Sequence, residues 1–189
     1  MSALRLAVII GSNREGRFGP TVADWFAEQA RQFDGLEVDV IDLAEIPLPT
    51  VIDFGAAPDA HVSQLGERLE RADAYVVVTP EYNHSFPAAL KNAIDLYREQ
   101  WRAKPVGFVS YGGMGGGLRA VEQLRLVFAE LHTVTVRDSV SFHNAWDRFD
   151  AHGRPVDEGC NAAAKGTLNQ LTWWARALRN AKTAEPYDV

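Results

Sequence analysis

The sequence predicts an α/β domain, a three-layer sandwich in which a five-stranded parallel sheet is covered by helices on both faces. Three observations lead to this fold class. Leu4–Ile10 and Tyr75–Thr79 are nearly continuous runs of apolar or β-branched residues, which is typical of strands buried on both faces. Segments with helical spacing alternate with strand-like segments. The length of 189 residues suits a single domain over residues 1–189.

The first half of the chain is expected to form two strands and two helices. Leu4–Ile10 is a buried strand, whereas Leu36–Leu43 alternates and predicts a more exposed one. Pro20 suits the first turn of a helix, and His61–Ala72 has helical spacing. The apolar residues that define the inward faces of these helices are Val22, Phe26, Ala30 and Phe33, and then Val62, Leu65 and Leu69.

The second half continues the alternation. Strands are expected at Tyr75–Thr79, Lys104–Ser110 and Thr133–Arg137. After the first of them, Ser85 is placed to cap a helix and Pro87 to stand in its first turn. The expected inward faces of the three helices are Phe86, Leu90, Ala93, Ile94 and Tyr97; Leu118, Val121, Leu124, Phe128 and Leu131; and, after a loop at Ser139–Glu158, Leu168, Leu171, Trp174, Ala175 and Leu178.

The composition excludes several classes of protein. Nineteen basic and 25 acidic residues give a net charge of −6, and no basic tract is present, so a nucleic acid partner is not expected. Cys160 is the only cysteine, which excludes an intramolecular disulfide and a thiolate zinc cluster. The five histidines lack metal-ligand spacing. No apolar run spans a membrane and no signal peptide is evident, so we expect a cytoplasmic protein without a membrane partner.

The loop that follows the first strand has the features of an anion site. Its glycines free backbone N–H groups, the helix that begins near Pro20 points its positive end toward it, and Ser12, Arg14 and Arg17 add donors. Gly16 stands where the Walker phosphate-binding pattern has its second glycine, but Arg17 follows in place of the lysine, and the magnesium-binding hydroxyl is also missing. A nucleoside triphosphatase is therefore not expected, and a solvated arginine loop is the alternative.

Two motifs stand out together: Gly11-Ser12-x-Arg14 and Pro80-Glu81-Tyr82-Asn83-x-Ser85-x-Pro87-x-x-Leu90-Lys91-Asn92-Ala93-x-Asp95. They resemble the NAD(P)H-dependent FMN reductase family, flavodoxin-like flavoproteins that include quinone, chromate and azo-dye reductases. The similarity in the order of elements extends roughly from Arg5 to Leu178. In the flavodoxin-like strand order 2-1-3-4-5, the loops after the first and third strands are neighbours at the edge where ligands bind.

By this resemblance the chain binds FMN and uses NADPH or NADH as co-substrate. The first loop holds the FMN phosphate, a second turn borders the isoalloxazine and ribityl groups, and a glycine-rich loop edges the pyrimidine end of the ring. The cofactor-binding residues so implied are Ser12, Arg14, Arg17, Phe18 and Gly19; Pro80, Glu81, Tyr82 and Asn83; and Ser110, Tyr111, Gly112 and Gly113. The residues suit these roles, because Tyr82 offers an aromatic wall and the glycines allow close backbone approach. Simple turn chemistry is the alternative for Tyr82 and Asn83.

The chain departs from the family pattern at three places. Arg17 stands where many relatives carry a small hydroxyl residue, and Ala88 stands where relatives often have glycine. Tyr97–Arg102 differs from the usual short connection.

The resemblance implies an FMN-dependent oxidoreductase. Hydride passes from NAD(P)H to flavin N5, and electrons then pass to a small-molecule acceptor: a quinone, azo compound, metal oxyanion or free flavin. No side chain is expected to act as a catalyst, and the Glu81 carboxylate is interpreted as structural. Relatives suggest a homodimer or homotetramer. A flavodoxin-type electron carrier, reduced by a partner protein, and a non-catalytic flavin-binding or regulatory module remain as alternatives.

Other side chains have simpler interpretations. Ser110 follows a strand, but Phe108 stands where a nucleophile elbow requires glycine, which argues against a hydrolase. His84 borders the presumed flavin and is interpreted as a solvent-facing loop residue. Of Trp173 and Trp174, one is expected in the core and the other at the surface or an interface.

Overall fold

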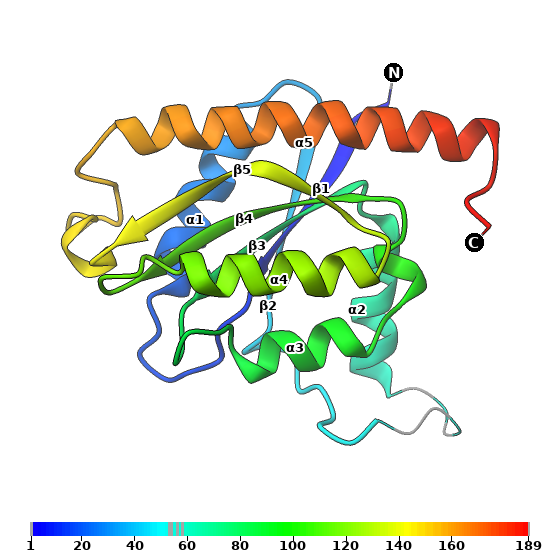
Figure 1. Cartoon of the computed structure of the whole chain (residues 1–189), viewed down its shortest axis with the longest axis horizontal. Helices are drawn as coiled ribbons and strands as arrows, with labels where there is room; N and C mark the ends of the chain where they lie inside the picture. Colours follow the sequence, from blue (N-terminus) through cyan, green and yellow to red (C-terminus); the bar gives the residue numbers. More distant parts are fainter. Residues whose placement is uncertain (1, 53–54, 56, 58, 189) are drawn as a thin grey trace.

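The computed structural model describes residues 2–52, 55, 57 and 59–188. It contains one parallel sheet with the strand order β2-β1-β3-β4-β5, which confirms the predicted fold class (Figure 1). The strands are β1 (Leu4–Ile10), β2 (Leu36–Asp42), β3 (Ala74–Pro80), β4 (Pro105–Gly112) and β5 (Val134–His143). The helices are α1 (Gly19–Arg31), α2 (Ala60–Arg71), α3 (Ala88–Asp95), α4 (Leu118–Glu130) and α5 (Gly159–Ala184), with short 3₁₀ turns at Glu99–Trp101 and Ala145–Asp147.

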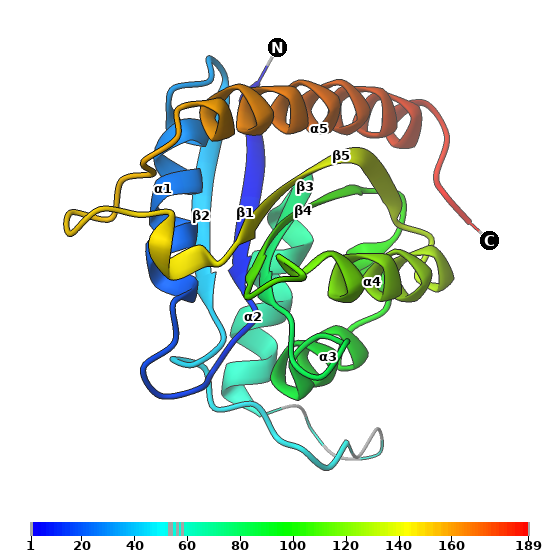
Figure 2. The ribbon, with the colours of Figure 1, turned by 60° about the vertical axis from the view of Figure 1, so that its left-hand side comes forward.

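The sheet is the middle of three layers (Figure 2). Helices α1 and α5 pack on one face, and α2, α3 and α4 pack on the other. The pleat of β1 directs Leu6 and Val8 toward the first pair of helices and Ala7 and Ile9 toward the other three. Every residue of β3 is buried, because both of its faces are covered and it has a neighbour at each edge.

A buried lysine ties the amino-terminal edge of the sheet to a helix end. Lys104 Nζ donates to the carbonyl oxygens of Leu69 and Glu70 and to the Tyr75 hydroxyl, at 2.9, 2.9 and 3.1 Å. The two carbonyls belong to the last turn of α2, where cations are favoured. Burial is the main cause that lowers the pKa of Lys104 to about 8.

Three details differ from the expectations. Strand β5 continues to His143, so the loop expected at Ser139–Glu158 begins too early. Val140 and Phe142 are buried on one side of this extension, but the polar Asp138 interrupts the apolar pattern that would have revealed it. Helix α3 begins at Ala88 without a side-chain cap, so Ser85 does not cap it and Pro87 stands before its first turn.

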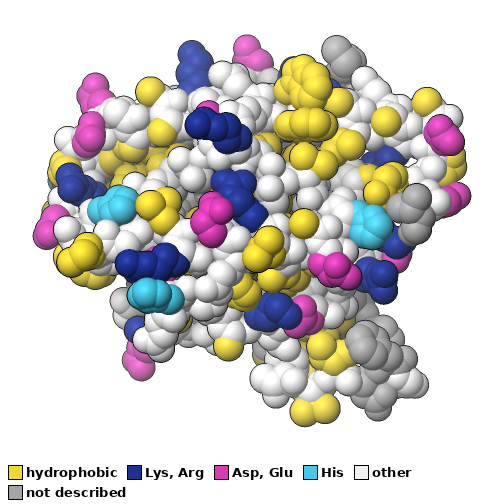
Figure 3. Space-filling model, viewed as in Figure 1, with side chains coloured by type: hydrophobic (Ala, Val, Ile, Leu, Met, Phe, Trp, Pro, Cys, Tyr) yellow, Lys and Arg dark blue, Asp and Glu magenta, His cyan; other side chains and the backbone are white. Residues whose placement is uncertain are grey.

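The expected core position of one of the two adjacent tryptophans is also wrong. Trp173 is 62% exposed and Trp174 is 37% exposed, because the buried stripe of α5 passes through Leu171, Thr172 and Ala175. Hydrophobic side chains gather over α5 on the face shown in Figure 3, whereas the charged side chains of that face are scattered. Among the described residues we find no helix with the length and apolar character of a membrane span.

Candidate functional site

Three loops meet at the carboxyl edge of the sheet. They follow β1, β3 and β4, which are adjacent strands. The hydroxyl groups of Ser12 and Tyr82 lie 2.6 Å apart and join the first two loops. The backbone N–H of Glu81 donates to the carbonyl of Tyr111 at 3.2 Å and joins the second to the third. The expected proximity of the loops after the first and third strands is therefore confirmed.

The loop after β1 presents unpaired backbone donors. Ser12 is fully buried, and its Oγ accepts the Arg14 N–H at 3.4 Å. Helix α1 begins directly after this loop with no side-chain cap and no acidic residue in its first turn. Several N–H groups of the loop donate to no other residue in the described part of the chain: those of Ser12, Asn13, Glu15, Gly16 and Phe18. Such an array beside the positive end of a helix favours an anion.

The two arginines of this loop have different surroundings. Arg17 forms a bidentate ion pair with Asp42 at 2.5 and 2.7 Å and also donates to the Ser12 carbonyl at 2.9 Å. The hydrogen bond to Asp42 is the main cause that raises the pKa of Arg17. Arg14 is exposed, and its guanidinium lies 4.1 Å from the centroid of the Tyr82 ring, a cation–π geometry. Within the described ranges Arg14 forms no ion pair, so it is the cation of the loop that is available to an anion.

Phe18, Gly19 and Tyr111 connect the start of α1 to β4. The Phe18 ring lies edge-on to Tyr111, with centroids 6.3 Å apart. A Cβ at Gly19 would lie 2.8 Å from the Tyr111 hydroxyl, so this approach requires glycine. The Tyr111 hydroxyl is buried near the Ser12 hydroxyl, without a hydrogen bond of good geometry among the described residues, and burial is the main cause that raises its pKa. An unpaired buried hydroxyl of this kind is the type of group that a bound ligand or water satisfies.

The predicted turn after β3 is a two-residue hairpin. The N–H groups of Tyr82 and Ser85 donate to each other's carbonyl oxygens at 2.9 and 3.0 Å. Asn83 and His84 between them have φ values of 52° and 68°. Two positive φ values are the pattern of a type I′ turn, in which glycine is usual at the second position. His84 is exposed, in agreement with its interpretation as a solvent-facing loop residue.

The Glu81 carboxylate holds this turn to α4. It accepts a bond from the Arg119 side chain at 2.5 Å and one from the Arg119 N–H at 3.3 Å, in the first turn of α4. The Glu81 side chain is only 10% exposed. It therefore has a structural role of the expected kind, and what Glu81 leaves for a ligand is mainly its backbone.

Two serine hydroxyl groups on the sheet hold the glycine-rich loop that follows β4. Ser110 and Ser141 both donate to the Gly116 carbonyl at 2.8 Å, and Ser110 is fully buried. The Ser110 hydroxyl thus points into the protein, although the resemblance places this residue at the cofactor. Gly112 and Gly113 are partly exposed at the surface of the loop, and the Gly113 N–H has no partner among the described residues. Pro80 is buried at the end of β3, and Ser110 is buried within β4.

A hollow of about 700 Å³ lies beside Arg14 and Tyr82. One wall comes from the loop after β2, which the sequence predictions did not include, although it also follows a strand at the carboxyl edge. The hollow is lined by Asn13, Arg14, Leu43, Ile46, Leu48, Thr50, Tyr82, Pro87, Ala88, Ala89 and Asn92. Its walls are mostly apolar, with polar groups at Arg14, Thr50 and the two asparagines, as in sites for small organic ligands.

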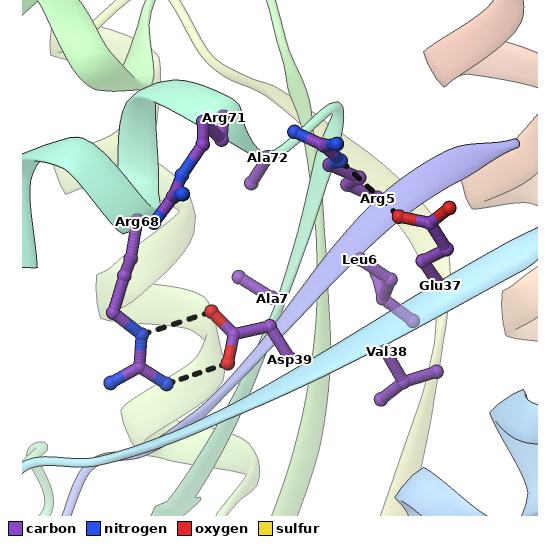
Figure 4. Close-up of a pocket in the computed structure, with 9 residues that line it drawn as sticks. All are labelled: Arg5, Leu6, Ala7, Glu37, Val38, Asp39, Arg68, Arg71 and Ala72. Atoms are coloured by element: carbon purple, nitrogen blue, oxygen red, sulfur yellow. Dashed lines mark hydrogen bonds and ion pairs between the residues drawn. The ribbon is translucent and has the colours of Figure 1, made fainter. Parts of the chain in front are cut away.

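A second hollow, of about 260 Å³, lies over the first halves of β1 and β2 (Figure 4). Arg68 is bonded to Asp39 at 2.6 and 3.0 Å, and Arg5 is bonded to Glu37 at 3.3 Å. These charges compensate one another, and none of the three loops contributes to the lining. The described residues contain no group of three or more His, Cys, Asp or Glu arranged to hold a metal ion.

Comparison with known proteins identifies the family. A family model described as NADPH-dependent FMN reductase matches residues 4–147, which include all three loops. The chain belongs to the NADPH-dependent FMN reductase family. The predicted family and the predicted enzyme class, an NAD(P)H-dependent FMN or quinone oxidoreductase, are confirmed.

Individual members of the family show how far the similarity extends. An NAD(P)H-dependent FMN reductase of Schizosaccharomyces pombe is 36% identical over 120 residues, and this alignment spans 60% of each chain, less than two thirds of the yeast protein. A 2-hydroxy-1,4-benzoquinone reductase of a Burkholderia species is 30% identical over 94% of this chain and 99% of its own. The solved structure of FerB, a flavoenzyme NAD(P)H:(acceptor) oxidoreductase from Paracoccus denitrificans, matches with a TM-score of 0.75 and 25% identity, covering 93% of this chain and 98% of FerB.

Proposed function

We propose that this chain binds FMN at the three loops, accepts hydride from NADPH or NADH, and passes electrons to a small-molecule acceptor. The observation that carries the proposal is the array of unpaired backbone N–H groups in the loop after β1, next to the uncapped start of α1 and the exposed Arg14. The hydrogen bond between the Ser12 and Tyr82 hydroxyl groups joins this loop to the hairpin. A phosphate site that adjoins an aromatic and glycine-rich edge suits a mononucleotide with a flat ring.

The residues present fit FMN at both ends. For the phosphate, the loop supplies its unpaired N–H groups and the exposed Arg14. For the ring edge, the N–H groups of Asn83 and Gly113 have no partner among the described residues. Arg17 is held by Asp42 in this structure, so its predicted contact with the phosphate requires that it share its donors with that carboxylate. Phe18 and Gly19 act by shaping the wall, and Ser110 by supporting the loop.

FMN, when bound, supplies the hydride and electron chemistry, and the protein supplies binding, orientation and access. Ser12 and Tyr82 fix the two loops relative to each other, and Glu81 fixes the hairpin to α4. None of these side chains needs to transfer a proton. The apolar hollow beside Tyr82 is of suitable size for a small planar acceptor such as a quinone, the substrate class in the name of the Burkholderia relative. A homodimer or homotetramer and a cytoplasmic location remain predictions.

Comparison of FMN with riboflavin tests the phosphate assignment. The two ligands share the ring and differ in the phosphate, so the wild-type protein should bind FMN at least about tenfold more tightly, as expected for charge-assisted hydrogen bonds. Flavin fluorescence quenching measures both dissociation constants. Arg14→Gln should weaken FMN binding about tenfold and leave riboflavin binding nearly unchanged. Arg137→Gln, at a side chain that is 92% exposed on β5, is the matched control.

Each result has a defined meaning. If Arg14→Gln leaves FMN binding unchanged and raises only the KM for the nicotinamide nucleotide, the phosphate assignment of Arg14 is wrong. If the wild-type protein binds neither flavin, the proposed function is wrong, and a regulatory module without flavin on the same fold is the correct alternative.

A further inference from the structure

The hairpin that we assign to the flavin ring has little support of its own. Asn83 and His84 are exposed, and Tyr82 and Ser85 are partly exposed, so no side chain of the turn is fully buried. Both central residues have positive φ values, 52° and 68°. A side chain with a Cβ is unfavourable in this region, and His84 occupies the position at which such turns usually have glycine. Contacts from outside the turn therefore help to hold this conformation, and the Glu81–Arg119 and Tyr82–Ser12 bonds already do so at its base.

Gln123 of α4 supplies a further contact, at the tip of the turn. Its Nε2 donates to the carbonyl of His84 at 2.8 Å, and its Oε1 accepts the hydroxyl proton of Ser85 at 2.5 Å. The side-chain amide thus bonds to two successive residues of the turn, across 38 and 39 positions in sequence. The side chain of Gln123 is exposed, but its backbone is fixed in α4, whose adjacent residues Val121 and Leu124 are buried in the core.

We infer that Gln123 is a positioning residue for the cofactor, acting through the hairpin. The inference rests on the proposed function, because it takes the hairpin as the flavin-ring contact. The path is short: Gln123 holds His84 and Ser85, Ser85 pairs with Tyr82, and the Tyr82 hydroxyl bonds to Ser12 in the phosphate loop. When the side-chain amide of Gln123 is lost, Asn83 and His84 can relax to negative φ values. This change moves the Tyr82 ring and the N–H group of Asn83. FMN then binds only the fraction of molecules in which the turn keeps the conformation seen here, and its apparent affinity falls by that fraction.

Four variants test this path: Gln123→Ala, His84→Gly, the double variant, and Gln170→Ala as control. Gln170 is a helical glutamine whose side-chain amide also bonds to the backbone, here by accepting the Asp138 N–H at 3.2 Å, and it lies on α5 away from the three loops. Gln123→Ala should raise the FMN dissociation constant about tenfold, and Gln170→Ala should not change it. Glycine at position 84 adopts positive φ without cost, so His84→Gly should restore most of the affinity in the double variant.

A second readout needs no cofactor. In the apo protein, the amide protons of Tyr82 and Ser85 should exchange with solvent about tenfold faster in Gln123→Ala than in wild type, while the midpoint of thermal unfolding stays close to wild type. A residue that merely stabilised the fold would show loss of affinity together with general destabilisation, and glycine at position 84 would not rescue it.

The outcomes separate this inference from the proposed function. If FMN affinity and amide exchange are unchanged in Gln123→Ala, or if affinity falls and His84→Gly does not rescue it, the role of Gln123 is refuted while FMN binding by the wild-type protein stands. If the wild-type protein does not bind FMN, the proposed function and the cofactor role both fail. The exchange measurement then still decides whether Gln123 holds the turn.

Discussion

The hydrogen bond between Ser12 and Tyr82 should be a measurable link between the phosphate loop and the hairpin. Ser12 is fully buried, and the two oxygens lie 2.6 Å apart. Ser12→Ala removes one partner and leaves the Tyr82 hydroxyl unpaired, which costs about 1–3 kcal/mol for a buried group. Tyr82 is partly exposed, so water compensates part of this loss. We therefore expect the free energy of unfolding to fall by about 1–2 kcal/mol.

The reverse substitution, Tyr82→Phe, keeps the ring on which Arg14 stacks and removes only the hydroxyl. It leaves the Ser12 Oγ with the long bond from the Arg14 N–H at 3.4 Å, so we expect a similar loss of about 1–2 kcal/mol. In the double variant neither hydroxyl is present, so neither leaves the other unpaired, and the only further loss is the long bond from the Arg14 N–H that Ser12→Ala also removes. Its loss should be smaller than the sum of the two single losses by about 1 kcal/mol.

Urea denaturation of the four apo proteins gives these free energies, and FMN titration of the same set shows whether the link serves the cofactor. Additive losses, agreeing with the sum within about 0.3–0.5 kcal/mol, would mean that the two hydroxyl groups do not interact in solution. The proposed connection between the loops would then be refuted.

Two further predictions concern the scaffold. Lys104→Met removes three hydrogen bonds, so the free energy of unfolding should fall by about 1–3 kcal/mol in urea denaturation. The Glu70 carbonyl loses its lysine donor, whereas the Leu69 carbonyl keeps its bonds from the Tyr75 hydroxyl and the Ala72 N–H. The pKa of Lys104 is lowered from 10.5 to about 8 by folding, so the unfolded chain holds that proton more tightly. The difference in free energy of unfolding between wild type and this variant should therefore grow as the pH rises from 8 to 10.5. A difference that shrinks over this range contradicts the assignment. Gly117→Ala combines a φ of 85° with a Cβ that would lie 2.6 Å from the Cβ of Ser110, whereas Gly153→Ala at φ 73° meets no atom closer than 3.5 Å. In thermal unfolding, Gly117→Ala should lower the free energy of unfolding clearly more than Gly153→Ala, for which we expect roughly 1 kcal/mol. Equal losses for the two variants would argue against the close packing of the glycine-rich loop.

The fold could be predicted because strands that are buried on both faces are continuous apolar runs in the sequence. The run at Val76–Val78 is fully buried in β3, and the strand bounds of β1 agree with the apolar run at Leu4–Ile10. The pattern fails where one residue breaks the alternation, as Asp138 does in β5. It also fails at Trp174, where helical spacing admits two adjacent stripes and only packing against the sheet decides between them.

The proximity of the loops that form the candidate site was predictable, but the bonds between them were not. Loops at the carboxyl ends of adjacent parallel strands had to meet, and Ser12 and Tyr82 do. The partner of Arg17 is Asp42, 25 positions away at the end of another strand, and local spacing contains no information about that pairing. Similarly, nothing in the segment around His84 predicts a positive φ, because the bonds from Gln123 that hold it come from α4.

The central claim is that this protein reduces a bound flavin with a nicotinamide nucleotide. The most direct measurement is the visible absorption spectrum of the FMN-loaded protein before and after anaerobic addition of NADPH or NADH. We predict that the flavin absorbance is lost with at least one nucleotide and returns when benzoquinone is added. A spectrum that persists with both nucleotides, while dithionite bleaches it, would contradict the claim and identify the chain as an electron carrier.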